Sequence, residues 1–321
     1  MSLSVPSFRA APSWPHLAAQ YDVREVCGVA VDSEDTVFVF ARSTIPILVF
    51  DRAGELQAAW GEGLFKQPHG IFVDDEAVWC ADYGDHTVRK FTKDGVLLLE
   101  IGTAGVPSDT GTTERNYKEV VRSGGPFNGP TDVAVGSDGQ VFVSDGYGNA
   151  RIHVFDKSGA LRGGWGSPGS DLGEFRLPHS VSLGQDELLY VADRENARVQ
   201  VFDRTGMSIR SVGDLHRPDD AVLSEDGMLY VAELGYLTRL ALKLPAPPGR
   251  PHSAIAVLAY DGALLCRLGT ADPSAAGSFH AAHALAFDSH GDLYVADVGL
   301  SAAGGQAPAG YRPIQKLERM S

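Results

Sequence analysis

The chain alternates short apolar runs with polar turns over most of its length. In "VSLGQDELLYVADRENARVQVF" (181–202), apolar residues recur at every second position within short runs, and Gly, Asp and Asn separate these runs. A period of two is typical of half-buried β-strands, and the separating residues favour tight turns. The pattern predicts an all-β protein, and we expect neither a helix of note nor a second domain.

Three segments repeat the same succession of runs and turns. Each has an apolar run, a turn, a second run that ends at an acidic residue, a loop, and a third run that ends in Phe. The segments are "PHGIFVDDEAVWCADYGDHTVRKF" (68–91), "PTDVAVGSDGQVFVSDGYGNARIHVF" (130–155) and "PHSVSLGQDELLYVADRENARVQVF" (178–202). A further turn and a last short run follow, so each unit predicts an antiparallel meander of four strands over ~40–50 residues.

The units can be aligned on the position that His179 occupies. The six equivalent positions are Cys27, His69, Thr131, His179, Asp219 and His283, at spacings of 42, 62, 48, 40 and 64 residues. The two long spacings contain the insertions "GVPSDTGTTERNYKEVVRSGG" (105–125) and "LPAPPGRPHSA" (244–254). Six such units predict one six-bladed β-propeller domain over residues 1–321, because sheets packed radially bury both of their faces. We expect the N-terminal segment, around Ser7 to Ala11, to complete the last blade.

Three of the six aligned positions hold histidine, and they fall on alternate blades. In a propeller the first strand of each blade lines the central channel, so His69, His179 and His283 are expected to converge. Three neutral imidazoles with an open fourth position are typical of a catalytic zinc site, although another divalent transition metal can bind the same donors. The sequence therefore predicts a metal site at these three residues.

Charge bears on the possible partners. The 27 Lys and Arg residues are outnumbered by 41 Asp and Glu residues, and the formal net charge is −14. Nucleic acids and anionic membranes are bound through basic residues, so we expect neither as a partner. The acidic surface is consistent with solubility, and no pattern in the chain indicates an oligomeric state.

The cysteines and the N-terminus bear on the cellular compartment. Cys27, Cys80 and Cys266 are odd in number and far apart in the chain, which does not suggest a disulfide framework. The first 20 residues contain no apolar run of signal-peptide length and no transmembrane candidate. We expect a reducing, cytoplasmic location.

Several segments resemble known families. "YVADRENARVQVF" (190–202) is similar to the blade signature of NHL-repeat propellers. More specifically, "SDGYGNARI" (144–152) and "ADRENARVQVF" (192–202) resemble consecutive blades of the peptidyl-α-hydroxyglycine α-amidating lyase family. A His after Pro is common in NHL repeats, so the alternative interpretation is that each histidine is structural.

The resemblance to the lyases implies roles for five residues. His69, His179 and His283 would bind the catalytic zinc. Tyr147 would act as the base on the substrate hydroxyl, and Arg42 would hold the substrate carboxylate. A phenol ionises near pH ~10 in water, so a base of this kind needs a cation beside it. A guanidinium is suited to bidentate binding of a carboxylate.

The chain departs from the family at the third histidine. The family has Met-Pro-His-Asp there, whereas this chain has Ala-Ala-His-Ala over residues 281–284. In the family the Asp contributes to a structural calcium ion, whose other ligands map to the backbone carbonyls of Val29 and Ile71. Because Ala284 offers no carboxylate, the sequence argues against calcium.

Three functions follow as predictions. The first is a metal-dependent lyase that cleaves the C–N bond of an α-hydroxylated amide of the glycine type, a carbinolamide, to an amide and a carbonyl product. Its substrate would be a small molecule that carries a carboxylate. The second is a metal-dependent hydrolase of a lactone, ester or amide at the same three histidines. The third is a non-catalytic NHL scaffold.

Overall fold

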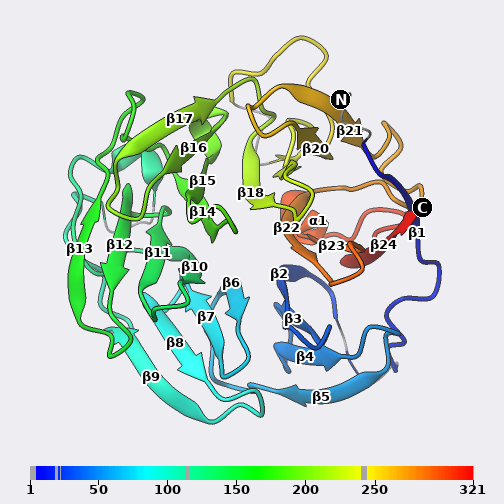
Figure 1. The fold of residues 1–321 in the computed structure, drawn as a ribbon, viewed down its shortest axis with the longest axis horizontal. Coiled ribbons are helices and arrows are strands. Elements are labelled where there is room, and N and C mark those ends of the chain that lie inside the picture. The colour runs from blue at the N-terminus through cyan, green and yellow to red at the C-terminus, as the bar shows by residue number, and fades with distance from the viewer. Residues whose placement is uncertain (1–4, 19–20, 22, 113–115, 240–243, 321) are drawn as a thin grey trace. The chain divides into compact units, whose positions relative to one another are not determined.

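The computed structural model describes residues 5–18, 21, 23–112, 116–239 and 244–320. These residues form six four-stranded antiparallel sheets and very little helix (Figure 1). The chain divides into two compact units, one formed by Gly61–Asp214 and the other by Met1–Trp60 with Leu215–Ser321. Among the helices of the described residues, none has the length and apolar character needed to cross a bilayer.

The unit Gly61–Asp214 contains three consecutive sheets. The first consists of β6 (Pro68–Val73), β7 (Val78–Asp82), β8 (Thr87–Phe91) and β9 (Leu97–Gly102). The second consists of β10 (Pro130–Val135), β11 (Val141–Asp145), β12 (Arg151–Phe155) and β13 (Leu161–Trp165). The third consists of β14 (Pro178–Leu183), β15 (Leu189–Asp193), β16 (Arg198–Phe202) and β17 (Ser208–Val212). Two 3₁₀ turns, η1 (Tyr117–Glu119) and η2 (Arg194–Asn196), lie in loops.

The other unit also contains three sheets. The first consists of β2 (Val26–Val31), β3 (Val37–Ala41), β4 (Ile47–Phe50) and β5 (Leu56–Trp60). The second consists of β18 (Pro218–Leu223), β19 (Leu229–Glu233), β20 (Ala254–Leu258) and β21 (Leu264–Leu268). The third consists of β22 (Ala282–Phe287), β23 (Leu293–Asp297), β24 (Ile314–Met320) and β1 (Ser7–Ala10), which pairs with β24. The short helix α1 (Gly299–Ala302) follows β23.

Apolar side chains fill the space between neighbouring sheets. In the first unit, Trp79, Phe127 and Phe155 form one such cluster, and the residues around Phe175 and Phe202 form the next. The period-two pattern places these side chains on the sheet faces, where their burial supplies the main driving force for folding. The first strands of these sheets also lie side by side, with β10 between β6 and β14 (Figure 1).

Every first strand contains an irregularity at the residue aligned from the sequence. The pairing register shifts between Pro68 and Ile71 in β6 and between Pro178 and Ser180 in β14. The same shift occurs in the other four first strands, β2, β10, β18 and β22. A β-bulge of this kind leaves one residue out of the ladder and changes the direction of its side chain. The three histidines therefore occupy equivalent bulges.

A buried carboxylate ends the second strand of five sheets. These residues are Asp82, Asp145, Asp193, Glu233 and Asp297. Each accepts a hydrogen bond from a backbone N–H of the segment that precedes the first strand of the same sheet. Arg176, for example, donates to Asp193. The sixth sheet has Ala41 at this position. The repeated carboxylate thus fastens the start of one strand to the end of the next.

Candidate functional site

His69 and His179 lie close together in the unit Gly61–Asp214. Each is only 1% exposed, and their ring centroids are 4.7 Å apart. β6 and β14 carry them, and the bulges turn both side chains out of the regular alternation of their strands. Two imidazoles in contact in a buried environment can share a ligand or a hydrogen-bond donor.

The hydrogen bonds of two histidines assign their tautomers. His69 Nδ1 lies 2.6 Å from the carbonyl oxygen of Thr131, and in the other unit His283 Nδ1 lies 2.7 Å from the carbonyl oxygen of Cys27. A carbonyl oxygen only accepts, so Nδ1 carries the proton and Nε2 keeps a lone pair. In both cases the acceptor occupies the aligned bulge position of a neighbouring sheet. This arrangement orients an imidazole as metal ligands are oriented.

Tyr147 lies beside the histidine pair. Its hydroxyl is 3.0 Å from His69 Nε2 and 3.4 Å from His179 Nε2, and its ring packs 4.8 Å from that of Tyr83 between centroids. Because His69 Nε2 keeps its lone pair, the Tyr147 hydroxyl is the donor in its contact with His69. Two of the predicted metal ligands and the predicted base are therefore brought together within one unit.

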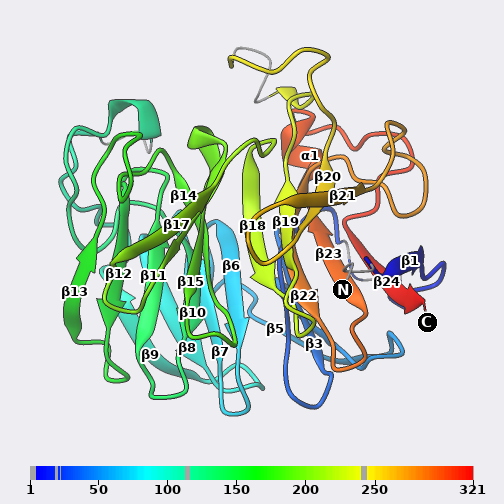
Figure 2. The same cartoon turned by 45° about the horizontal axis from the view of Figure 1, so that its top comes forward.

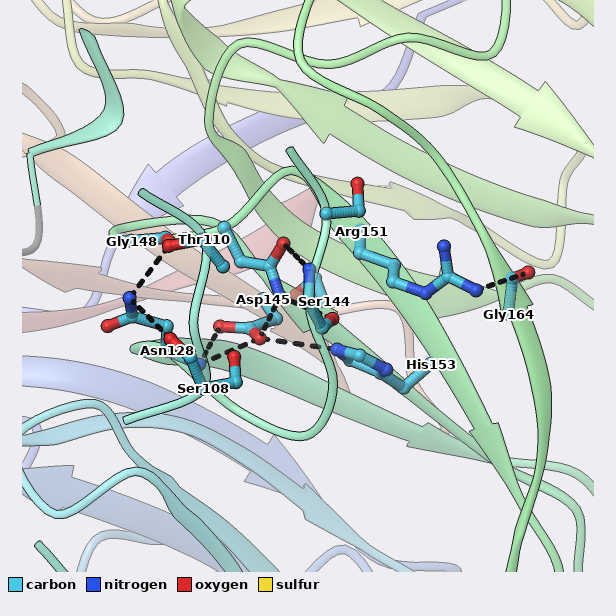
Figure 3. Close-up of polar contacts among 12 residues, drawn as sticks. Ser108, Thr110, Asn128, Ser144, Asp145, Gly148, Arg151, His153 and Gly164 are labelled. Carbon is cyan, nitrogen blue, oxygen red and sulfur yellow. Dashed lines mark hydrogen bonds and ion pairs between the residues drawn. The ribbon is translucent and has the colours of Figure 1, made fainter. Parts of the chain in front are cut away.

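A buried polar network holds the loop that carries Tyr147 (Figure 3). Asp145 lies between Asn128, whose backbone N–H it accepts at 2.9 Å, and His153, whose Nε2 lies 3.2 Å from it. Thr110 donates to the carbonyl oxygen of Gly148, and Gly148 donates its N–H to the carbonyl oxygen of Asn128. A Cβ at Gly148 would lie 2.5 Å from the Asn128 side chain, so only glycine permits this approach.

Arg194 is a further residue of this region that was not singled out from the sequence. It is only 8% exposed, and its guanidinium carbon lies 5.8 Å from the centre of the Tyr147 ring. A cation at this place favours negative charge on the phenol. Arg194 directly follows β15, as Arg42 directly follows β3. Aligning the blades at this position could therefore have identified Arg194 from the sequence.

Arg42 lies in the other unit, in a buried ion pair. Its Nη1 is 2.9 Å from Glu25 Oε2 and 3.3 Å from Ser301 Oγ. Glu25 also accepts the N–H of Ser301, which belongs to α1. Glu25 supplies a carboxylate to a sheet whose second strand ends at Ala41 instead of at an acidic residue, and its ion pair orients the Arg42 guanidinium. The role of Arg42 toward a substrate carboxylate stays a prediction.

The predicted calcium ligands belong to regular strands. Val29 lies in β2 and Ile71 in β6, and both are buried. Ala284 lies in β22, directly after His283, and brings no carboxylate to that strand. The argument against calcium stays a prediction.

The donor chemistry fits a transition metal. His69, His179 and His283 each offer one imidazole nitrogen, and all three are buried, at 1%, 1% and 5% exposure. For His69 and His283 the backbone carbonyl at Nδ1 leaves Nε2 as the available donor. Neutral imidazole nitrogens suit zinc and other divalent transition metals.

Comparison with known proteins agrees with the repeat structure. The family model described as "NHL repeat" matches residues 127–155 and 175–202. NHL repeat-containing protein 3 of Mus musculus is 32% identical over 262 residues, which cover 76% of this chain and 72% of that protein. These matches confirm the similarity to NHL-repeat proteins that the sequence indicated.

A second relative is a lyase. The probable peptidyl-alpha-hydroxyglycine alpha-amidating lyase of Caenorhabditis elegans is 36% identical over 186 residues, 53% of this chain. The match spans about half of that protein, 49% of its length. The resemblance to amidating lyases inferred from the sequence is thus confirmed as a distant relationship.

A solved structure supports the fold. The structure titled "Streptogramin B lyase structure" superposes with a TM-score of 0.60 at 16% identity and covers 98% of both chains. At this level of identity the likeness concerns the fold alone. It confirms the predicted fold class, a six-bladed β-propeller with four-stranded antiparallel blades.

Proposed function

The chain belongs to the NHL-repeat family, and on that premise we propose that it is a metal-dependent lyase of small carbinolamides. His69, His179 and His283 would hold one divalent transition metal, with zinc as the first candidate. The substrate is an N-(α-hydroxy) amide that carries a carboxylate, and the products are an amide and a carbonyl compound.

One observation carries the proposal: the hydroxyl of the half-buried Tyr147 contacts two buried histidines that occupy aligned bulges. Tyr147 lies within 3.0 Å of His69 and 3.4 Å of His179. A scaffold without chemistry has no need to bury two imidazoles against a phenol, because buried polar groups cost free energy unless they are paired. The relationship to an amidating lyase supports the same reaction class.

The chain's own residues supply the proton transfers. A metal bound to the three histidines would polarise the substrate oxygen. Tyr147 accepts the proton of the α-hydroxyl group as the C–N bond breaks, and returns a proton to the departing amide nitrogen. The hydroxyl carbon becomes the carbonyl carbon, so no water is consumed. Tyr147 acts as the phenolate before the first transfer and is the neutral phenol between the two transfers. Arg194, whose guanidinium carbon lies 5.8 Å from the ring centre, favours the phenolate that begins and ends the cycle.

Arg42 would bind the substrate carboxylate. Its ion pair with Glu25 orients the guanidinium, and a guanidinium can bind a carboxylate through two N–H donors. The loss of the Met and the Asp that the lyase family has around the third histidine favours a small metabolite over a peptide as substrate.

Metal analysis tests the proposal first. Purified protein should contain about one transition metal per chain, and His179→Ala should reduce this at least tenfold. His153→Gln is the matched control, because His153 is also buried and Gln200 holds the same position in the next sheet. Equal metal content in wild type and His179→Ala would refute the site.

A product assay then separates lyase from hydrolase. α-Hydroxyhippurate should yield benzamide and glyoxylate, without ¹⁸O from labelled water in the benzamide. Tyr147→Phe should lower kcat by ~10²-fold or more and leave the metal content unchanged. Benzoate that contains solvent oxygen would instead identify a hydrolase, and turnover unchanged by both Tyr147→Phe and His179→Ala would exclude either reaction at this site.

A further inference from the structure

The loop between β19 and β20 encloses a pocket in the unit that contains α1. Figure 2 shows this loop, in yellow, extending beyond the ends of its strands on the side where α1 lies. The pocket has a volume of about 270 Å³. Thr238, Arg239 and His252 from the loop line it, together with His280 and Ala302. The Pro-rich insertion identified in the sequence is part of this loop.

Two polar groups in the pocket have no partner among the described residues. The Thr238 hydroxyl is buried, with the residue only 7% exposed, and forms no hydrogen bond. Arg239 also lines the pocket, and no hydrogen bond or ion pair joins its guanidinium to the described part of the chain. Among the buried polar side-chain atoms that no described residue pairs, Thr238 Oγ1 is the one that belongs to a described residue of this pocket wall, so the pocket can admit a group that pairs with it.

The described residues that line the pocket include one arginine, Arg239, and two histidines, His252 and His280. Burial lowers the pKa of His280, and the charge of Arg312 lowers it further, against the weaker opposing effect of Asp272. His280 is therefore neutral near pH 7 and acts as a hydrogen-bond partner rather than a cation. Among the described residues that line the pocket, Arg239 is the one Lys or Arg side chain, and its planar fork matches the geometry of a carboxylate.

Apolar side chains make up much of the remaining wall, beside Ser253 and His252. Leu237, Phe279, Ala302 and Pro308 line the pocket, and Phe279 is fully buried behind it. The volume is at the small end of the range for ligand sites, about 300–1,000 Å³. One arginine, one unpaired hydroxyl and these apolar side chains select a ligand with one negative charge and a compact hydrocarbon part.

We propose that this pocket binds a small monocarboxylate with an apolar body. The carboxylate pairs with Arg239 and accepts a hydrogen bond from Thr238, and the apolar part lies against Phe279 and Ala302. This site is additional to the proposed lyase site, because none of its residues is a proposed metal ligand or takes part in the proposed reaction.

The test uses 3-phenylpropanoate as probe and its uncharged analogue 3-phenylpropanamide as reference. Calorimetry is performed on full-length protein after chelator treatment, so that no metal competes for the carboxylate. The carboxylate should bind about tenfold more tightly than the amide, because an ionised partner strengthens the hydrogen bonds to Arg239. Arg239→Gln should abolish this difference, and Thr238→Val should weaken carboxylate binding by about threefold.

Two controls distinguish this proposal from the lyase proposal. Arg162→Gln removes an exposed arginine of the other unit and should leave binding unchanged. His179→Ala should also bind the carboxylate as wild type does, even if it loses metal and activity. Equal affinity for acid and amide, no binding of either probe, or insensitivity to Arg239→Gln would overturn the proposal. Loss of binding in His179→Ala would place the probe at the histidines and overturn it as well.

Discussion

The two inserted loops of the chain, residues 103–129 between β9 and β10 and residues 234–253 between β19 and β20, differ in how their polar groups are bonded. The one between β9 and β10 is packed tightly: Asn128 donates through Nδ2 to the carbonyl oxygens of Ser108 and Thr112 and to the Thr110 hydroxyl. The one between β19 and β20 leaves the Thr238 hydroxyl without a partner and a pocket beside it. Both insertions are polar and rich in Gly or Pro, so composition alone does not distinguish them.

The two loops differ in the partners of their hydrogen bonds. In the first insertion they run inward to Asn128 and to Gly148, and they hold the loop that presents Tyr147. In the second, the ends of the loop bond to neighbouring segments, and the described bonds further along are local, as in those from Arg250 to the carbonyl oxygen of Tyr236. The bonds of Asn128 and Thr110 to neighbouring segments brace the first loop. Ser108 Oγ and Asn128 Oδ1 nevertheless have no partner among the described residues, and the Thr238 hydroxyl of the second loop has none either. The second loop differs in that its unpaired hydroxyl belongs to a residue that lines a pocket.

The largest effect is expected from Asn128→Ala in the braced insertion. The substitution removes three hydrogen bonds and leaves buried acceptors unpaired, so we expect a loss of about 3 kcal/mol in the free energy of unfolding. Urea denaturation followed by circular dichroism measures this loss.

The matched control lies in the same insertion. Asn116 caps η1 by accepting the N–H of Lys118, and it is less buried than Asn128. Asn116→Ala should cost no more than about 1 kcal/mol. Similar losses in the two variants would show that the buried network does not brace the loop.

A smaller effect on stability is expected when pH changes the charge of Asp297, a buried residue that contacts the pocket wall. Asp297 accepts the N–H groups of His280 and Gly299, two residues of the pocket wall, and burial raises its pKa to about 7. Between pH 4 and pH 7 the Asp297 carboxyl is therefore protonated in the folded state and ionised in the unfolded state. Stability from this group is complete below pH 4 and declines as pH rises toward 7.

The variant Asp297→Asn isolates this contribution. The difference in unfolding free energy between wild type and Asp297→Asn should fall by about 2 kcal/mol from pH 5 to pH 7. Chemical denaturation at both pH values provides the measurement. A difference that stays constant or grows with pH would show that Asp297 is ionised in the folded protein throughout this range.

Thr110→Val should have a moderate effect. The Thr110 hydroxyl is buried, donates to the carbonyl oxygen of Gly148 and accepts from Asn128. Valine has a similar shape but leaves both partners unpaired, so we expect a loss of about 1.5 kcal/mol in the free energy of unfolding. Thermal or urea unfolding of the variant, compared with wild type, provides the value.

Thr238→Val should have the smallest effect on stability, within about 0.5 kcal/mol of wild type. It makes the same chemical change, but the hydroxyl that it removes has no partner. The same unfolding experiment applies to both threonines. Equal costs at Thr110 and Thr238 would remove the distinction between the two insertions.

Much of the fold could be predicted because the repeat is local and regular. The alternation of apolar residues sets the strands. A Phe four residues before the aligned position in four of the six units supports the register that aligned His69, His179 and His283. The aligned positions coincide with β-bulges in all six first strands. Bulges do not appear in a period-two pattern, so the sequence could align these residues but not show why their side chains leave the ladder.

The surroundings of Tyr147 were less predictable. Asn128 and Arg194 owe their positions to loops that follow no period, and their contacts with Gly148 and Tyr147 connect distant parts of the chain. The Glu25 partner of Arg42 also lies outside any motif. The pocket beside α1 depends on how an aperiodic loop closes, which the pattern of apolar residues does not specify.

The repeated bulge has a consequence for how this chain can change over evolution. The backbone irregularity is present whether the residue is His179, Thr131 or Asp219. The local conformation therefore does not depend on the side chain, and a single codon change at such a position can add or remove a ligand without a new backbone. Chemistry in such a chain can be acquired or lost one blade at a time, while the scaffold is inherited intact.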